Sequence, residues 1–214
     1  MTKIFWGCFL LINLLAYKTF AYTPSEGKVT ALFGPYIYQT KFNGANGFDA
    51  PNLTDLGLIA EGDLNSSGGL EIALFHMNKI FYRHKEGQYI AEQTELVEIT
   101  MGYRRWWTNY FSSALAFYSS YSIGVPKIIR SDFAVGSEID TSARDITEYG
   151  FDFSLQAELW SNETYAVILD TRYGLSVTSK QNEEGDHWSA LVGLRYTIQE
   201  KLRPKTYKSP NLKR

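Results

Sequence analysis

Residues 97–123, VEITMGYRRWWTNYFSSALAFYSSYSI, decide the fold of this chain. Val97 and Ile99 alternate with polar residues, and the same alternation resumes after Trp107-Thr108. Successive side chains of a β-strand point to opposite faces, so each half of the stretch has one apolar and one polar face. The stretch therefore predicts two antiparallel strands joined by a tight turn.

The same period of two recurs along the chain and predicts eight strands. They are expected at about 28–40, 54–64, 69–82, 89–106, 109–124, 147–160, 164–178 and 186–198. The connections alternate between tight ones at 65–68, 107–108 and 161–163 and longer ones over 41–53, 83–88, 125–146 and 179–186. A chain that runs up and down returns to the same rim after every second strand, so this alternation predicts an all-β, antiparallel up-and-down barrel. Short turns on one rim, longer loops on the other and about 10 residues per span are typical of outer-membrane barrels.

Alternation alone does not decide which face points outward, because a soluble lipocalin-like carrier has its apolar face inside. Three observations favour an outward apolar face and therefore a transmembrane barrel. Small residues such as Ser112 and Ala114 lie on the polar face, where a narrow lumen needs them. Aromatic residues gather near both strand ends, as at two membrane interfaces. The chain beyond its first segment also lacks the disulfides common in secreted soluble proteins.

Residues 1–21 are predicted to be a secretory signal peptide. Lys3 precedes an apolar run over 4–16, and Thr19-Phe20-Ala21 gives a small-x-small cleavage site. The run is shorter than the roughly 18–20 apolar residues that a spanning helix needs. The one cysteine, Cys8, lies in this segment, so the mature chain is expected to have no disulfide, cysteine nucleophile or zinc–cysteine site.

The remaining length suits one domain, a barrel over 22–199 followed by a basic tail over 200–214. Six lysines and arginines face a single acid, Glu200, in this tail. A basic terminus either binds a polyanion or is simply solvated, and we expect a solvated periplasmic tail. No nucleic-acid partner is expected.

The chain resembles the small eight-stranded outer-membrane barrels of Gram-negative bacteria, the OmpA/OmpX-like and OmpW-like group. The resemblance covers about residues 28–198 and rests on the strand pattern and on the last strand. Gly193, Tyr196 and Ile198 have the spacing of the signal that the barrel assembly machinery reads, although Leu191 stands where a polar residue is usual. The resemblance implies a monomeric, porin-like protein of the cell outer membrane, in contact with outer-membrane lipid and lipopolysaccharide. The tail is too short for the peptidoglycan-binding domain of full-length OmpA.

Charged side chains on the polar face form the main candidate site. They are Glu61, Glu98, Arg104, Asp152, Glu158, Asp170, Arg172 and Arg195. Their mixed signs favour a polar plug of paired charges over a gated pore or proton path. If the turn at 161–163 sets the register, Arg172 lies opposite Asp152, and an even closure of the next loop brings Arg195 near Asp170. Asp63 and Glu71 flank a tight turn without an evident cation.

Two strands, those at 28–40 and 69–82, have no clearly polar face. Phe75 and Met77 share one face with Glu71 and Lys79. Alternation by itself therefore leaves their inward face undecided.

His187 and Ser189 are the one suggestive catalytic pair. Outer-membrane lipid A deacylases of the PagL type, which this pair resembles, use a His and a Ser two apart on one strand together with a glutamate. The downstream acid here, Glu200, lies too far along the same strand to reach the imidazole at about 3.3 Å per residue. His76 and His84 have no partners at metal-ligand spacing. No catalytic residue, metal or cofactor is therefore predicted.

The sequence predicts an integral outer-membrane barrel with a plugged lumen, a structural or surface-interaction role and no enzymatic activity. Two alternatives stay open. One is a channel for small or apolar solutes, which the resemblance to OmpW-like barrels implies. The other is a lipid hydrolase that uses His187 and Ser189. Planar-bilayer conductance distinguishes the first, and mass spectrometry of lipid A the second.

Overall fold

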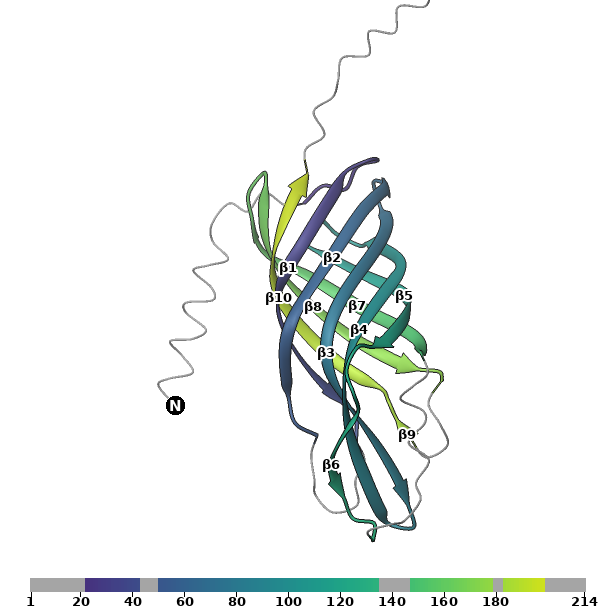
Figure 1. Cartoon of the computed structure of the whole chain (residues 1–214). Coiled ribbons are helices and arrows are strands. Elements are labelled where there is room, and N and C mark those ends of the chain that lie inside the picture. The colour runs from purple at the N-terminus through teal and green to yellow at the C-terminus, as the bar shows by residue number, and fades with distance from the viewer. Residues whose placement is uncertain (1–21, 43–49, 135–146, 179–182, 199–214) are drawn as a thin grey trace, which may run out of the picture.

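The computed structural model describes residues 22–42, 50–134, 147–178 and 183–198; the predicted signal peptide and basic tail lie outside them. The barrel strands are β1 (Val29–Thr40), β2 (Leu53–Asn65), β3 (Gly68–Lys85), β4 (Gln88–Trp106), β5 (Phe111–Ser122), β7 (Glu148–Ser161), β8 (Tyr165–Ser176) and β10 (His187–Ile198). Each pairs antiparallel with its neighbours, and β10 closes on β1 (Figure 1). The predicted eight-stranded up-and-down barrel is therefore confirmed. No helix among the described residues is long and apolar enough to cross a membrane.

The apolar face of the barrel points outward. Leu155 and Val192 are 50% and 49% exposed at mid-strand, whereas Arg104 and Asp170, on the opposite face of the wall, are 1% and 0% exposed. A soluble carrier would bury its apolar face, so the lipocalin-like alternative is wrong. The exposed face is the lipid-contacting band of a transmembrane barrel.

The two ends of the barrel differ. We call the end with the tight turns, the start of β1 and the end of β10 the turn end, and the opposite end the loop end. Exposed aromatic residues lie near the turn end at Trp107, Tyr110, Phe111, Tyr165 and Tyr196. A second set lies near the loop end at Tyr121, Tyr149, Tyr173 and Trp188. Two such sets mark two membrane interfaces.

The connection between β3 and β4 corrects the prediction of a longer loop over 83–88. It is a two-residue turn, in which Glu86 and Gly87 have φ of 52° and 80°. Two successive positive φ angles belong to the tight hairpin turns that match the twist of the strands. The strands themselves are longer than predicted, at 18 and 19 residues. The hairpin therefore continues well past the membrane-spanning length of about 10 residues.

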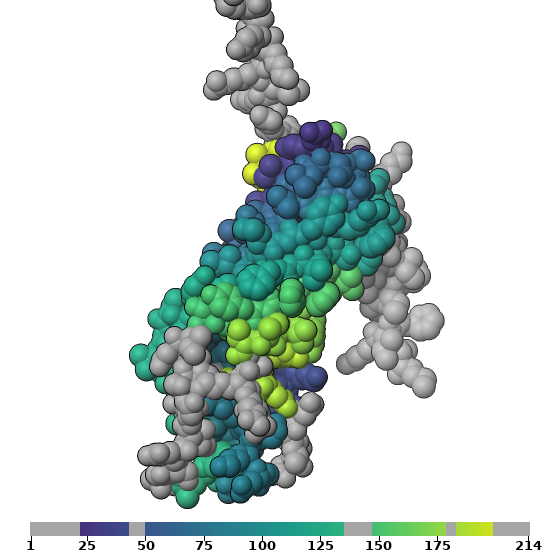
Figure 2. Space-filling model, turned by 90° about the vertical axis from the view of Figure 1, so that its right-hand side faces the viewer, coloured from purple at the N-terminus to yellow at the C-terminus, as the bar shows by residue number. Residues whose placement is uncertain are grey.

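Two short strands widen this hairpin where it extends beyond the rest of the barrel wall. β6 (Lys127–Ser131) pairs with β4, and β9 (Glu183–Glu184) pairs with β3. The order β6-β4-β3-β9 defines what we call the loop-end sheet. Figure 2 shows it projecting at the lower end of the molecule, opposite the start of β1 and the end of β10.

The inward faces of β1 and β3, which the sequence left undecided, are largely apolar, and so is the part of β2 between them. Leu32, Ile59, Phe75 and Met77 are nearly fully buried inside the barrel and form one cluster with Leu191 of β10. Leu70, Ile72 and Leu74 of β3 point outward and are exposed. Both faces of these strands are apolar because one contacts lipid and the other packs across the lumen, so no alternation appears in the sequence.

Candidate functional site

A layer of buried charges crosses the barrel interior, and Arg172 of β8 lies at its centre. Its Nε donates to Asp170 Oδ1 at 2.6 Å and its Nη1 to Asp152 Oδ2 at 2.7 Å. Its Nη2 donates to Glu71 Oε1 at 2.8 Å. One guanidinium thus joins carboxylates from β8, β7 and β3, and we call this layer the plug.

Arg104 of β4 completes the plug. Its guanidinium donates to Glu71, with Nε at 2.7 Å from Oε2. It also donates to the hydroxyls of Ser112 at 2.8 Å and Ser154 at 2.9 Å, and its Nε lies 3.2 Å from Glu61 Oε1. Small hydroxyl side chains on β5 and β7 therefore leave room for the guanidinium and also bind it.

Glu71 therefore has two cations, although the sequence suggested none. Arg104 reaches it as a diagonal neighbour from the adjacent strand β4, and Arg172 reaches it across the lumen from β8. Asp63, at the other side of the same turn, accepts hydrogen bonds from the Tyr22 hydroxyl at 2.8 Å and the Ser25 amide at 3.0 Å. No sequence signal identified these partners, because they depend on strand register, on closure of the barrel and on the path of the chain before β1.

The register of β7 and β8 differs from the prediction. Arg172 lies opposite Ser154, not Asp152, because the pairing already starts offset at the turn, where Ser161 lies opposite Ala166. The bulge between Glu158 and Trp160 moves the pairing back by only one residue. The ion pair with Asp152 still forms, since diagonal neighbours on one face of a sheet are within reach of a long side chain. The predicted contact is present, but the predicted register is wrong.

The predicted proximity of Arg195 and Asp170 is also wrong. Arg195 lies opposite Ala166, and Asp170 lies opposite Leu191. The pairing of β8 with β10 begins with Gly174 opposite His187, which is offset by four residues from the register that the prediction assumed. Arg195 instead pairs with Glu158.

At the turn end of the lumen, aromatic rings pack against Arg195. Its guanidinium carbon lies 4.2 Å from the ring centroid of Tyr22 and 5.7 Å from that of Trp106. The two rings contact each other at 4.7 Å between centroids. Cation–π contacts of this kind hold a charge without full hydration.

A second polar cluster lies nearer the loop end and contains the suggested catalytic pair. His187 Nε2 lies 3.6 Å from Glu98 Oε1, and Ser120 donates to the other oxygen of Glu98 at 3.1 Å. Glu98 is the acid next to His187 that the sequence did not indicate, because it comes from β4 and not from the last strand. His187 and Ser189 are both buried on the lumen side, away from the lipid.

Lys79 and Glu148 belong to the same cluster and were not predicted as site residues. Lys79 Nζ, fully buried, donates to the two oxygens of Glu148 at 2.8 and 3.0 Å. The Tyr118 hydroxyl donates to Glu148 at 3.1 Å. Lys79 lies on the same face of β3 as Met77. Because the sequence left the inward face of that strand undecided, Lys79 was not assigned to the lumen.

The structure thus places all eight predicted lumen residues inside the barrel, in three groups. The plug holds Glu61, Arg104, Asp152, Asp170 and Arg172; Glu158 and Arg195 lie at the turn end, and Glu98 lies toward the loop end. Among the described residues, no group of three or more His, Cys, Asp or Glu side chains is arranged to hold a metal ion.

The loop-end sheet has its own small core. Ile80, Tyr82 and Tyr89 pack with Ala91, and the ring of Phe42 stacks on Tyr82 at 4.2 Å between centroids. Burial there raises the pKa of the Tyr82 hydroxyl to about 12, so it stays protonated at neutral pH. This core makes the sheet a packed element outside the barrel wall.

No family model matches the chain, and no curated protein matches it. Solved structures are similar to it. OprG, an outer-membrane protein of Pseudomonas aeruginosa, aligns with a TM-score of 0.52 and 13% identity over 83% of this chain and 98% of OprG. Ail, the attachment invasion locus protein of Yersinia pestis, solved with the heparin analogue sucrose octasulfate, aligns with a TM-score of 0.49 and 13% identity over 81% of this chain and 99% of Ail.

At these identities the similarity concerns the fold. The chain has the fold of the small eight-stranded outer-membrane barrels. Its continuous outward apolar band, bordered by aromatic residues, fits the same location. The protein is an outer-membrane β-barrel.

Proposed function

We propose that this outer-membrane barrel is a closed, non-enzymatic protein whose loop-end sheet is a surface for interaction with an extended partner segment. The observation that carries the proposal is the sheet β6-β4-β3-β9, which continues the barrel wall beyond its apolar band. A membrane anchor alone needs strands of about 10 residues, so the longer β3 and β4 serve the region outside the membrane.

β6 is the edge of the loop-end sheet. In the described part of the chain, its outer side has no strand partner. All five of its residues are exposed, including Ile128 and Ile129 at 59% and 49%. An exposed edge with apolar side chains is a template for addition of a strand from another chain. Lys127 adds positive charge, which favours an acidic partner segment.

The plug supports a closed lumen. Arg104 and Arg172 are bound on several sides by carboxylates and hydroxyls, and water hardly reaches these groups. Passage of a solute through this layer requires several charge-assisted hydrogen bonds to break together, which disfavours the channel alternative. The lipid hydrolase alternative is disfavoured because His187 and Ser189 face the interior, where a membrane lipid does not reach.

We further propose that the turn end is periplasmic and that the protein is a monomer in contact with lipopolysaccharide at the loop end. Short turns face the periplasm in barrels of this kind. The spacing of Gly193, Tyr196 and Ile198 at the end of β10 serves recognition by the barrel assembly machinery in this proposal.

Orientation is tested with single cysteines, since Cys8 is the only natural cysteine. Lys85→Cys at the loop end is expected to react with a membrane-impermeant maleimide on intact cells. Thr108→Cys at the turn end is expected to react only after the outer membrane is permeabilised. Both positions are exposed, so accessibility differs only by the side of the membrane. The reverse pattern of labelling contradicts the orientation.

The interaction surface is tested with Ile129→Pro, which removes an edge N–H at a residue without a partner in β4. Short randomised peptides are selected on the protein in lipid nanodiscs. We expect the parent protein to enrich extended peptides that alternate apolar and acidic residues. Ile129→Pro is expected to lose this enrichment, and the matched control Ile129→Val to keep it. Equal enrichment on the proline variant refutes strand addition at β6.

A further inference from the structure

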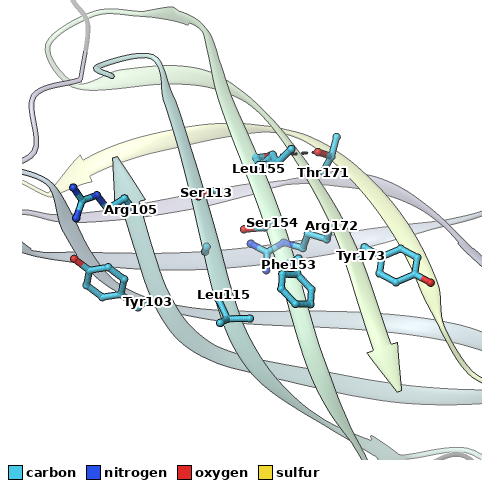
Figure 3. Close-up of a pocket in the computed structure, with 11 residues that line it drawn as sticks. Tyr103, Arg105, Ser113, Leu115, Phe153, Ser154, Leu155, Thr171, Arg172 and Tyr173 are labelled. Atoms are coloured by element: carbon cyan, nitrogen blue, oxygen red, sulfur yellow. Dashed lines mark hydrogen bonds between the residues drawn. The ribbon is translucent and has the colours of Figure 1, made fainter. Parts of the chain in front are cut away.

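The lipid-facing wall has a groove of about 570 Å³ that crosses β4, β5, β7 and β8 (Figure 3). The strand register builds it from two rows of outward side chains. One row is bulky: Tyr103, Leu115, Phe153 and Tyr173. The other, two residues along each strand, has small side chains at two of its positions: Arg105, Ser113, Leu155 and Thr171.

The floor of the groove is made of inward residues between the two rows, such as Ala114 and Ser154. Neither they nor Ser113 and Thr171 fill the space beside the bulky row. Thr171 also turns its hydroxyl toward the Leu155 carbonyl, at 3.5 Å, so it presents its methyl group with little demand for other polar partners. The groove is therefore an apolar channel on the surface that contacts acyl chains.

The end of the groove near the turn end carries a positive charge. The Arg105 guanidinium carbon lies 5.5 Å from the ring centroid of Trp107. The Trp107 indole donates to Ser113 at 2.8 Å, which fixes the ring beside the groove. No carboxylate among the described residues forms an ion pair with Arg105. An arginine and a tryptophan side by side are suited to the interface between acyl chains and headgroups.

We propose that this groove binds one acyl chain of an anionic phospholipid, with its phosphate held by Arg105. The lipid belongs to the leaflet at the turn end, which is the periplasmic leaflet in the orientation proposed above. The positive charge of Arg105 favours an anionic headgroup. The small side chains of Ser113 and Thr171 leave space for an acyl chain that lies across the strands. Because barrel strands tilt by about 35–45°, a groove across them leads from the interface into the hydrocarbon region.

The experiment is native mass spectrometry of the purified protein in mild detergent, titrated with palmitoyl-oleoyl phosphatidylglycerol or with the matching phosphatidylcholine. We expect one tightly held phosphatidylglycerol per barrel, bound about tenfold more tightly than phosphatidylcholine, as a charge-assisted contact gives. Arg105→Gln is expected to remove this preference. Thr171→Leu, which narrows the groove, is expected to weaken the binding of both phospholipids about fivefold, because the acyl chain loses apolar contact.

The matched control is Ala60→Leu, an outward position on β2 outside the groove, which is expected to leave both affinities unchanged. Folding of each variant is checked by heat-modified electrophoretic migration, and Ser113→Leu replaces Thr171→Leu if the latter does not fold. Equal binding of the two phospholipids by the parent overturns the proposal, as does an unchanged preference in Arg105→Gln. Binding of lipopolysaccharide that Arg105→Gln weakens also overturns it, because that lipid belongs to the other leaflet and is not expected in the groove.

Discussion

Replacing Arg172 with methionine is expected to lower the free energy of unfolding from lipid by about 3–5 kcal/mol, the cost of leaving buried charges without their partner. Arg172 holds Asp170, Asp152 and Glu71 at 2.6–2.8 Å. Its loss leaves carboxylates of like sign close together, with little water to screen them. The measurement is the urea midpoint of unfolding in lipid vesicles.

The matched control for this variant is Lys127→Met on the exposed β6, for which a change below about 0.5 kcal/mol is expected. Glu71→Gln in the Arg172→Met background is expected to recover part of the loss, because it removes one of the unpaired charges. The charge swap Arg172→Asp with Asp152→Arg is expected to recover little, since one arginine at 152 does not replace a guanidinium that serves three carboxylates. Full recovery by the swap contradicts this geometry of the plug.

Placing an arginine on the lipid face at mid-strand is expected to have the second largest effect. Val192 is outward and 49% exposed near the middle of β10. Val192→Arg is expected to cost about 2–4 kcal/mol in a bilayer, because the guanidinium loses hydration near the membrane midplane. The free energy of unfolding in vesicles measures this directly.

Val177→Arg is the control for depth. Val177 follows the end of β8 at the loop end and is also exposed, so its arginine reaches the interface. A cost of about 0–1 kcal/mol is expected there. If Val192→Arg unfolds at the same urea concentration as the parent, the outward face is not in contact with lipid.

The sequence by itself determined the architecture of this protein. Alternation with a period of two is a local property of a strand, and the outward face of a membrane barrel must be apolar along its whole length. The stretch at 97–123 therefore predicted the second half of β4, β5 and the turn between them, and the same pattern predicted most of the other barrel strands. The charged residues of the plug could be predicted because they alternate with apolar residues along a strand. When the apolar residues face lipid, the charged residues between them face inward.

Only the tertiary structure decided which charges meet. The register of β7 and β8 is set by the pairing of Ser161 with Ala166 next to the turn and by a one-residue bulge between Glu158 and Trp160, and no residue type in the sequence marks either. Glu98 reaches His187, and Glu148 reaches Lys79, across the lumen from strands far apart in the chain. Contacts of this kind depend on closure of the barrel, which brings distant segments together and is invisible to any local pattern.

The tertiary structure also decided the shape of the loop end and of the lipid-facing wall. The short β6 and β9 have strand partners only because β3 and β4 extend past the barrel, so neither had a signal of its own. The lipid-facing groove depends on the register of four strands, since Ser113 and Thr171 lie in one row only after those strands pair. Periodicity fixes the face on which a side chain lies, whereas pairing between strands fixes its neighbours. This is the physical reason why the sequence predicted the fold and the inward charges, but not which side chains meet.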